Sequence, residues 1–236
     1  MSAEIVYGRR PVRELLRGRR QALEVLATER ALSAEPWVRE AGVRVTVKPE
    51  RDLTALAGVR DHQGVVARAE PYRYADAYEL AAGESPLIVC LDRVTDPRNL
   101  GAVCRSAEFA GASGVIVPER RSAAVTASTC KASAGAVEHL QVAHVRNLAD
   151  WLAEAKAAGF WIWGADADAQ AAPWSVDLKG PTVLVLGGEG KGIRPRVAAA
   201  CDGLIALPRG GEVESLNVSA AAAAVLFEAV RQRGRA

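Results

Sequence analysis

From residue 86 onward, short apolar runs alternate with segments of helical periodicity, and this alternation restricts the fold more than any other feature of the chain. We predict strands at 86–94, 114–119, 160–167, 182–190 and 203–209, and helices at 99–111, 149–159 and 217–233. Strands that alternate with helices form parallel sheets whose two faces are covered by the helices. The sequence therefore predicts an α/β fold with a mostly parallel sheet.

The first 70 residues predict a second, smaller α/β unit. Its expected helices lie at 11–18, 34–42 and 50–58, and its expected strands at 22–28, 43–48 and 64–69. The stretch 71–85 has no clear period and contains Pro71 and Gly83. We therefore expect a small N-terminal domain at 1–72, a linker at 73–85 and a larger domain at 86–236.

Composition and cysteine spacing exclude several classes of protein. The net charge of the 236 residues is only +2, so an anionic partner has to be argued from local clusters. No run reaches the roughly 18 apolar residues of a spanning helix, and the N-terminus lacks a signal-peptide pattern, so we expect a cytoplasmic protein without membrane contact. The four cysteines have no CxxC spacing and the chain holds three histidines, so we expect reduced cysteines and no metal.

A glycine-rich loop follows the apolar run that begins at residue 182. Gly188, Gly190 and Gly192 are spaced GxGxG near the end of their domain, whereas a dinucleotide fold needs GxGxxG after its first strand. Lys191 is followed by Gly192 rather than by Ser or Thr, which excludes a P-loop. A nicotinamide-dependent oxidoreductase is therefore disfavoured, and a glycine-rich turn without a ligand remains the alternative for this loop taken alone.

Three strand ends in the larger domain carry unusual polar or glycine residues: 92–108, 183–195 and 205–228. In open α/β sheets, ligands bind at the carboxyl ends of strands. We therefore expect these three segments to build one site.

Together the three segments resemble the SpoU (TrmH-like) family of RNA ribose 2′-O-methyltransferases, members of the SPOUT class. The first segment matches the Asn-x-Gly-x-x-x-Arg box of the family with Asn99, Gly101 and Arg105, the second matches its Gly-Glu-Gly-x-Gly loop, and the third matches its Ser-Leu-Asn-Val-Ser turn. Residues 5–16 and 62–69 resemble the L30e-like RNA-binding domain of the branch that methylates guanosine in 23S rRNA.

The resemblance implies a cofactor and its site. S-adenosylmethionine would lie in a C-terminal trefoil knot, held by the backbone around four residues: Gly187, Gly188, Leu207 and Leu216. Glycines permit the close backbone approach that a flat heterocycle requires. The methyl group would pass to a ribose hydroxyl of RNA.

The resemblance also implies which residues serve the reaction. Arg105 corresponds to the proposed base of the family, but a guanidinium stays protonated, so it could instead clamp a phosphate and stabilise the developing alkoxide. Asn99 would organise the Arg105 loop or begin a helix, and Glu189 would pair with an arginine or orient the ribose. Ser215 and Asn217 would contact the site or cap the last helix.

The expected partners are RNA, most of all 23S rRNA, and a second copy of the chain in a homodimer, with neither DNA nor a membrane. The same chemistry on tRNA or on an rRNA adenosine is one alternative, and a non-catalytic RNA-binding or ribosome-assembly protein is another. We expect a basic RNA-binding surface near the first helix and a second basic group beside the cofactor loops. The first comprises Arg9, Arg10, Arg13, Arg17, Arg19 and Arg20, and the second comprises Arg194, Arg196 and Arg209.

Overall fold

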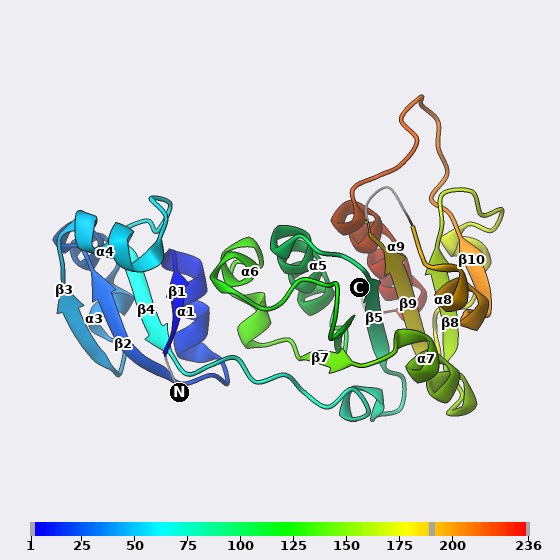
Figure 1. Cartoon of the computed structure of the whole chain (residues 1–236), viewed down its shortest axis with the longest axis horizontal. Coiled ribbons are helices and arrows are strands. Elements are labelled where there is room, and N and C mark those ends of the chain that lie inside the picture. The colour runs from blue at the N-terminus through cyan, green and yellow to red at the C-terminus, as the bar shows by residue number, and fades with distance from the viewer. Residues whose placement is uncertain (1–2, 189–191, 235–236) are drawn as a thin grey trace.

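The N-terminal part of the chain forms a four-stranded sheet in the order β1-β4-β2-β3 (Figure 1). The computed structural model describes residues 3–188 and 192–234. β2 runs parallel to β3, while β4 is antiparallel to both β1 and β2. The elements are β1 (Glu4–Tyr7), α1 (Arg9–Arg17), β2 (Ala22–Ala27), α2 (Glu29–Ala34), α3 (Pro36–Arg39), β3 (Arg44–Val47), α4 (Glu50–Ala57) and β4 (Val65–Ala69).

The C-terminal part forms a parallel six-stranded sheet in the order β10-β8-β9-β5-β6-β7. Its strands are β5 (Leu87–Asp92), β6 (Gly114–Pro118), β7 (Val142–Val145), β8 (Trp161–Ala165), β9 (Thr182–Gly187) and β10 (Gly203–Ile205). Its helices are α5 (Pro97–Phe109), α6 (Ala127–Ala132), α7 (Leu148–Ala157), α8 (Pro195–Ala200) and α9 (Val218–Gln232). Short 3₁₀ turns are η1 (Glu79–Ala81), η2 (Ala136–Glu138) and η3 (Pro173–Ser175). The predicted α/β fold with a parallel sheet is confirmed, and the trefoil knot stays a prediction.

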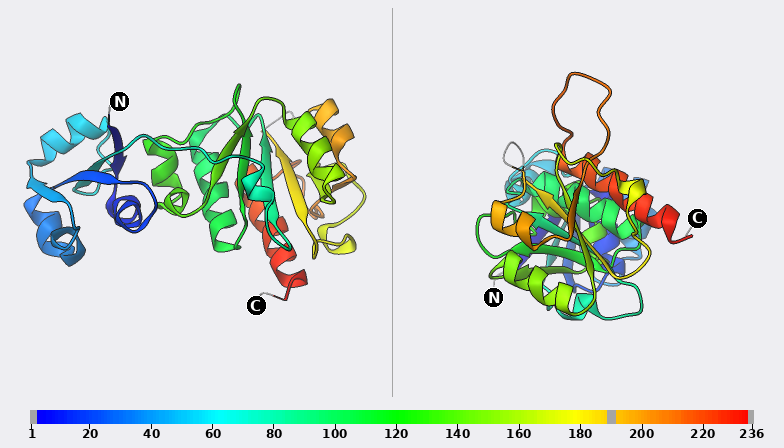
Figure 2. Two further views of the ribbon diagram at one scale, coloured as in Figure 1. Left: turned by 90° about the horizontal axis from the view of Figure 1, so that it is seen from below. Right: turned by 90° about the vertical axis from the view of Figure 1, so that its right-hand side faces the viewer.

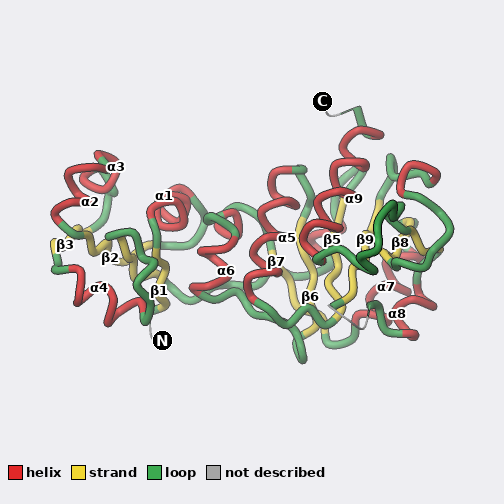
Figure 3. Tube along the Cα trace, turned by 90° about the horizontal axis from the view of Figure 1, so that it is seen from above, coloured by secondary structure: helices red, strands yellow, loops and turns green. Residues whose placement is uncertain are grey.

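Alternation along the central strand divides the core into two layers. Leu87, Val89 and Leu91 of β5 face the cluster that contains α5 and α9, whereas Ile88 and Cys90 face the cluster that contains α7 and α8. All six residues of β5 are buried. Figures 2 and 3 show α5 and α9 on one face of the sheet and α7 and α8 on the other. A strand buried on both faces accounts for the continuous apolar run at 86–91.

Several elements differ from the sequence prediction. The prediction missed β1, α2, α6, α8 and β7, and it extended the strand at 203–209 too far, since β10 ends at Ile205. The proposed linker at 73–85 contains η1, and Ala75 forms an isolated bridge with Ala143 beside β7. The division at residues 72 and 85 therefore stays our interpretation of a segment that packs on the larger sheet.

The two parts meet around one buried arginine. Arg20 donates from Nη1 to Glu4 Oε2 at 3.0 Å and from Nε to Glu138 Oε2 at 3.1 Å, and its Nη2 pairs with Glu138 Oε1. The side chains of Arg20 and Glu138 are 7% and 0% exposed. Its guanidinium carbon also lies 5.6 Å from the centroid of the Tyr72 ring. This charge pair is shielded from solvent, so it holds the two parts in one arrangement.

Close backbone packing surrounds this pair. A Cβ at Gly18 would lie 2.7 Å from Glu138 Cβ, and one at Gly135 would lie 2.6 Å from Glu14 Cβ. Gly135 also has a φ of +91°, which favours glycine. Arg19 donates to the carbonyl of His139. The prediction that Arg20 belongs to an RNA-binding surface is therefore wrong, because its side chain is buried at the domain boundary. Arg19 is exposed, and its RNA-binding role stays a prediction.

We expect Glu138→Ala to lower the free energy of unfolding by about 3–5 kcal/mol, because it leaves the buried guanidinium of Arg20 without its principal partner. Urea denaturation measures this change. Glu70→Ala removes a carboxylate whose partner, Arg73, is 83% exposed, so it should cost less than about 1 kcal/mol. If Glu138→Ala and Glu70→Ala are equally stable, the buried pair does not hold the boundary.

Candidate active site

The carboxyl end of β5 is joined to the glycine loop through Asp92. Its carboxylate is fully buried and accepts from Arg194 backbone N at 2.8 Å and Nε at 2.7 Å, and Arg194 Nη2 lies 2.7 Å from Oδ1 in an ion pair. Its carbonyl accepts from the backbone N of Gly188 at 2.9 Å. The first and second of the three predicted segments therefore meet at this residue.

The glycines at the end of β9 lie where side chains have no room. A Cβ at Gly187 would lie 2.0 Å from the carbonyl carbon of Gly192, and one at Gly188 would lie 2.4 Å from the carbonyl oxygen of Arg93. Gly188 and Gly192 also form an isolated bridge. This turn leaves main-chain groups as the surface that a ligand could contact. Glu189, a predicted site residue, lies outside the described residues, as do Gly190 and Lys191.

An amide pair joins the first segment to the third. Asn217 Nδ2 donates to Asn99 Oδ1 at 3.0 Å, and Asn99 is 9% exposed. Asn217 also caps α9, because its Oδ1 accepts from the backbone N of Ser219 at 2.9 Å. Asp96, not Asn99, caps α5, accepting from the backbone N of Arg98 at 2.8 Å. Asn99 therefore does not cap α5, which was its alternative interpretation. Asn217 both caps α9 and contacts Asn99.

The other predicted residues lie at more open positions. Arg105 is exposed on α5, and Leu207 is half-buried against the core on the α5 and α9 side. Ser215 is exposed, and Leu216 is 59% exposed. Both lie between β10 and α9, directly before Asn217, and the stretch that contains them projects from the body of the molecule at the top of Figure 1. The structure thus brings Gly187, Gly188, Asn99 and Asn217 to the carboxyl edge of the sheet, whereas Ser215 and Leu216 are exposed.

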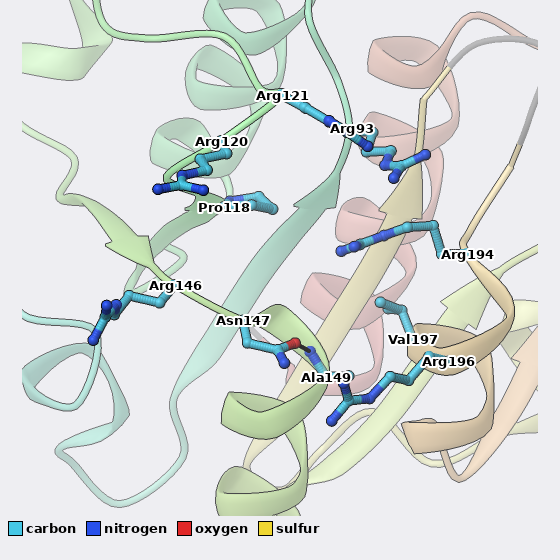
Figure 4. Close-up of a pocket in the computed structure, with 10 residues that line it drawn as sticks. All are labelled: Arg93, Pro118, Arg120, Arg121, Arg146, Asn147, Ala149, Arg194, Arg196 and Val197. Atoms are coloured by element: carbon cyan, nitrogen blue, oxygen red, sulfur yellow. Dashed lines mark hydrogen bonds between the residues drawn. The ribbon is translucent and has the colours of Figure 1, made fainter.

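Six arginines surround a pocket of about 350 Å³ at the same edge of the sheet (Figure 4). The second basic group predicted from the sequence included two of them, Arg194 and Arg196. The other four were missed: Arg93, Arg120, Arg121 and Arg146. They follow three different strands, so only the sheet order brings them together. A signal was present in the pair of arginines directly after the run at 114–119.

The described residues were compared with three kinds of feature: reactive thiols, grouped metal ligands and membrane-spanning helices. Burial raises the pKa of all four thiols, to about 12 for Cys130 and about 11 for Cys201, so they stay protonated at neutral pH. Within residues 3–188 and 192–234, no three His, Cys, Asp or Glu side chains are grouped as metal ligands. No helix in this part of the chain is long and apolar enough to cross a membrane.

Comparison with protein families assigns both parts of the chain. The profile of the SpoU rRNA Methylase family matches residues 86–227. The profile described as RNA 2′-O ribose methyltransferase substrate binding matches residues 5–75. The chain belongs to the SpoU rRNA methylase family. The predicted family and enzyme class, an RNA methyltransferase that uses S-adenosylmethionine, are confirmed.

This chain aligns with several proteins of known name over most of its length. It is 43% identical to the 23S rRNA (guanosine-2′-O-)-methyltransferase RlmB of Xanthomonas campestris, over 86% of this chain and 84% of that one. It is 38% identical to a Synechocystis protein named as an uncharacterized tRNA/rRNA methyltransferase, and spans 63% of that longer protein. The crystal structure of the SpoU methyltransferase AviRb from Streptomyces viridochromogenes with AdoMet has a TM-score of 0.83 and 30% identity, covering 98% of this chain and 91% of that one.

Two substitutions at Asn217 separate its capping role from its site role. We expect Asn217→Ser to keep a capping oxygen and near-normal stability, because serine is a favoured N-cap residue, but to lose the amide that reaches Asn99 and with it most methyl transfer. Asn217→Ala should also lose about 1 kcal/mol of stability. Thermal unfolding and methyl transfer to rRNA measure the two effects. Full activity in Asn217→Ser would assign Asn217 to capping alone.

Proposed function

We propose that this SpoU enzyme methylates the ribose 2′-oxygen of a guanosine in 23S rRNA. The observation that carries the proposal is the Asn217–Asn99 hydrogen bond, which places the third segment on the first at the sheet edge where Asp92 holds Gly188. The 43% identity to a relative named for guanosine in 23S rRNA supports the choice of substrate. We infer that the enzyme works in the cytoplasm, where bacterial ribosomal RNA is made and modified.

The residues at the end of β9 fit a cofactor that is gripped by main-chain groups. The turn at Gly187 and Gly188 would be filled by a Cβ at either position, so close backbone approach depends on glycine there. We propose that Gly187, Gly188, Leu207 and Leu216 hold S-adenosylmethionine, with Glu189 and Ser215 beside the target ribose. When bound, this cofactor supplies an electrophilic methyl group.

Arg105 provides the charge that the target nucleotide needs. During transfer the ribose oxygen would gain a bond to the methyl carbon as the bond from that carbon to sulfur breaks, leaving its electron pair on a neutral thioether, and the oxygen would give up its proton. A guanidinium stays protonated and cannot accept that proton. We therefore propose that Arg105 clamps a neighbouring phosphate and stabilises the developing alkoxide, and that the proton leaves through that phosphate or through water. Asn99, six residues earlier in α5, fixes the start of the helix relative to α9.

The N-terminal part offers an open pocket with cationic side chains for the rest of the RNA. This pocket of about 990 Å³ is lined by four cationic side chains, Arg9, Arg30, Lys48 and Arg60, and by three carboxylates, Glu29, Glu50 and Asp61. Cationic side chains around an open pocket bind phosphates with little dependence on sequence. A substrate-binding domain of this kind fits a large folded RNA. Methylation of tRNA or of an rRNA adenosine remains the alternative substrate, and the assay below distinguishes it.

We expect Arg105→Ala to keep S-adenosylmethionine binding and to lower methyl transfer about 10²–10³-fold, because a charge that acts in the transition state is removed. Transfer of a radiolabelled methyl group to deproteinised 23S rRNA and to a tRNA pool, followed by nucleoside mapping, measures rate and target together. Arg98→Ala is the matched control, since Arg98 is an exposed arginine on the same helix. A product in tRNA, or on another base, would contradict the proposed substrate.

We further propose that the enzyme acts as a homodimer through α5 and α9. Phe109 and Phe227 are 78% and 42% exposed on these neighbouring helices, with ring centroids 6.0 Å apart. Adjacent exposed aromatic rings are typical of protein interfaces. Arg105 lies one helical turn before Phe109, so the two share a face of α5. An interface here would border the proposed site.

We expect the double variant Phe109→Glu/Phe227→Glu to elute as a monomer of 24.9 kDa and to lose methyl transfer, because two charges replace the centre of the apolar patch. Light scattering coupled to size exclusion measures the mass. Trp174→Glu removes an aromatic that is 57% exposed on η3 and should leave the dimer intact. A wild-type protein that is monomeric at assay concentration would rule out this interface.

A further inference from the structure

The arginine pocket shown in Figure 4 concentrates positive charge at the carboxyl edge of the sheet. Arg93 follows β5, Arg120 and Arg121 follow β6, and Arg146 follows β7. Arg194 and Arg196 enter from the start of α8. In Figure 4, Arg121 lies beside Arg93 at one border and Arg194 extends toward the pocket from the opposite side, while the guanidinium of Arg146 points away.

Most of this charge is uncompensated. Arg194 pairs with Asp92 at 2.7 Å and Arg196 pairs with Asp150 at 2.6 Å. The other four arginines form no ion pair with a carboxylate in the described parts of the chain. The buried Nε of Arg93 finds no acceptor among the described residues either. Like charges gathered at one pocket repel one another, so the cluster favours an anion between them.

Backbone strain holds two of these arginines in place. Arg93 and Arg121 have φ angles of 60° and 61°, in the left-handed region that residues with a Cβ seldom adopt. Only Gln63 and Ala134 share this property among the described non-glycine residues. Strained positions gather at ligand sites because the surrounding structure has to enforce them. The surrounding structure therefore holds the chain in a set conformation at two positions of the pocket that carry an arginine.

We propose that this pocket binds a phosphodiester group of the RNA substrate beside the target nucleotide. Arginine recognises phosphate through a planar fork of donors. The uncharged lining of the pocket is Pro118, Ala149, Val197 and Asn147, with no aromatic ring on which a base could stack. The pocket therefore fits the backbone of RNA rather than a base.

The pocket borders the cofactor loop. The carbonyl of Arg93 lies against Gly188, and Asp92 contacts both Gly188 and Arg194. A phosphate held by these arginines would place the strand next to the proposed methyl donor, on the side of the sheet that α7 and α8 cover. This assignment deepens the proposed function and rests on it: Arg105 would hold the nucleotide at α5, and the pocket would hold the strand across the sheet edge.

Substitution of the exposed pair Arg120 and Arg121 tests the assignment. We expect Arg120→Ala/Arg121→Ala to lower kcat/KM for 23S rRNA about tenfold and to leave the affinity for S-adenosylmethionine unchanged. The slope of log affinity against log salt should fall by about 0.7, the value for one lost contact to a single strand. Arg120→Lys/Arg121→Lys keeps the charge without the fork, so we expect partial recovery.

A charge-matched control lies at the opposite edge of the sheet. Lys179→Ala/Arg231→Ala removes two exposed cations near the start of β9 and the end of α9, and its RNA affinity and salt slope should match the wild type. If Arg120→Ala/Arg121→Ala also matches the wild type in both, the pocket does not bind RNA. Weakened binding of inorganic pyrophosphate with unchanged RNA affinity would overturn the assignment too, because the pocket would then serve a free anion.

The pocket and the proposed function can fail separately. Filter binding of a single-stranded RNA needs no methyl transfer. If the wild type methylates neither 23S rRNA nor tRNA, the proposed function fails. A reduced salt slope in the alanine pair would still support a phosphate site. If the wild type methylates 23S rRNA and the alanine pair is indistinguishable from the Lys179/Arg231 control, only the pocket assignment fails.

Discussion

The buried carboxylate of Asp92 is the interaction on which the arrangement of the site depends. It ends the central strand β5 and is fully buried, so it is tolerable only because Arg194 gives it two hydrogen bonds and an ion pair. The carbonyl of the same residue accepts from Gly188. Asp92 therefore holds Gly188 and Arg194, which lie on the two sides of the glycine loop, at the edge of the sheet. The path of the loop depends on the contacts that stabilise this buried carboxylate.

This constraint explains why the site combines side chains with main-chain groups. Around Gly187 and Gly188 the backbones approach so closely that no Cβ fits, and recognition there falls to amides and carbonyls. Side-chain chemistry comes from α5, whose first turn is tied to α9 by Asn99 and Asn217. Arg105 extends from the exposed face of the same helix. In the site that we propose, main-chain groups at Gly187 and Gly188 would hold the methyl donor, and Arg105 would supply charge to the acceptor.

The sequence predicted the fold class, the order of the long elements and the three segments of the site, because apolar periodicity and glycine spacing are local patterns. It missed β7 and α8, which span only four and six residues and are too short to show a clear apolar period. It also placed Arg20 on an RNA-binding surface. A run of arginines does not reveal a carboxylate more than a hundred positions away, and Glu138 is the partner that buries Arg20. The arginine pocket was missed for the same reason, since its members follow separate strands.

The Arg20–Glu138 pair also bears on how RNA can be recognised. Two basic regions face solvent: the pocket near Arg30 and Lys48 in the N-terminal sheet, and the arginine pocket at the edge of the larger sheet. If the two parts moved freely, the distance between these regions would vary and could not select one RNA over another. A buried ion pair surrounded by close glycine contacts favours one spacing of these regions. On the function that we propose, an RNA that contacts both regions would have to match this spacing through its own fold, and that match would select one target although the protein contacts mostly phosphates.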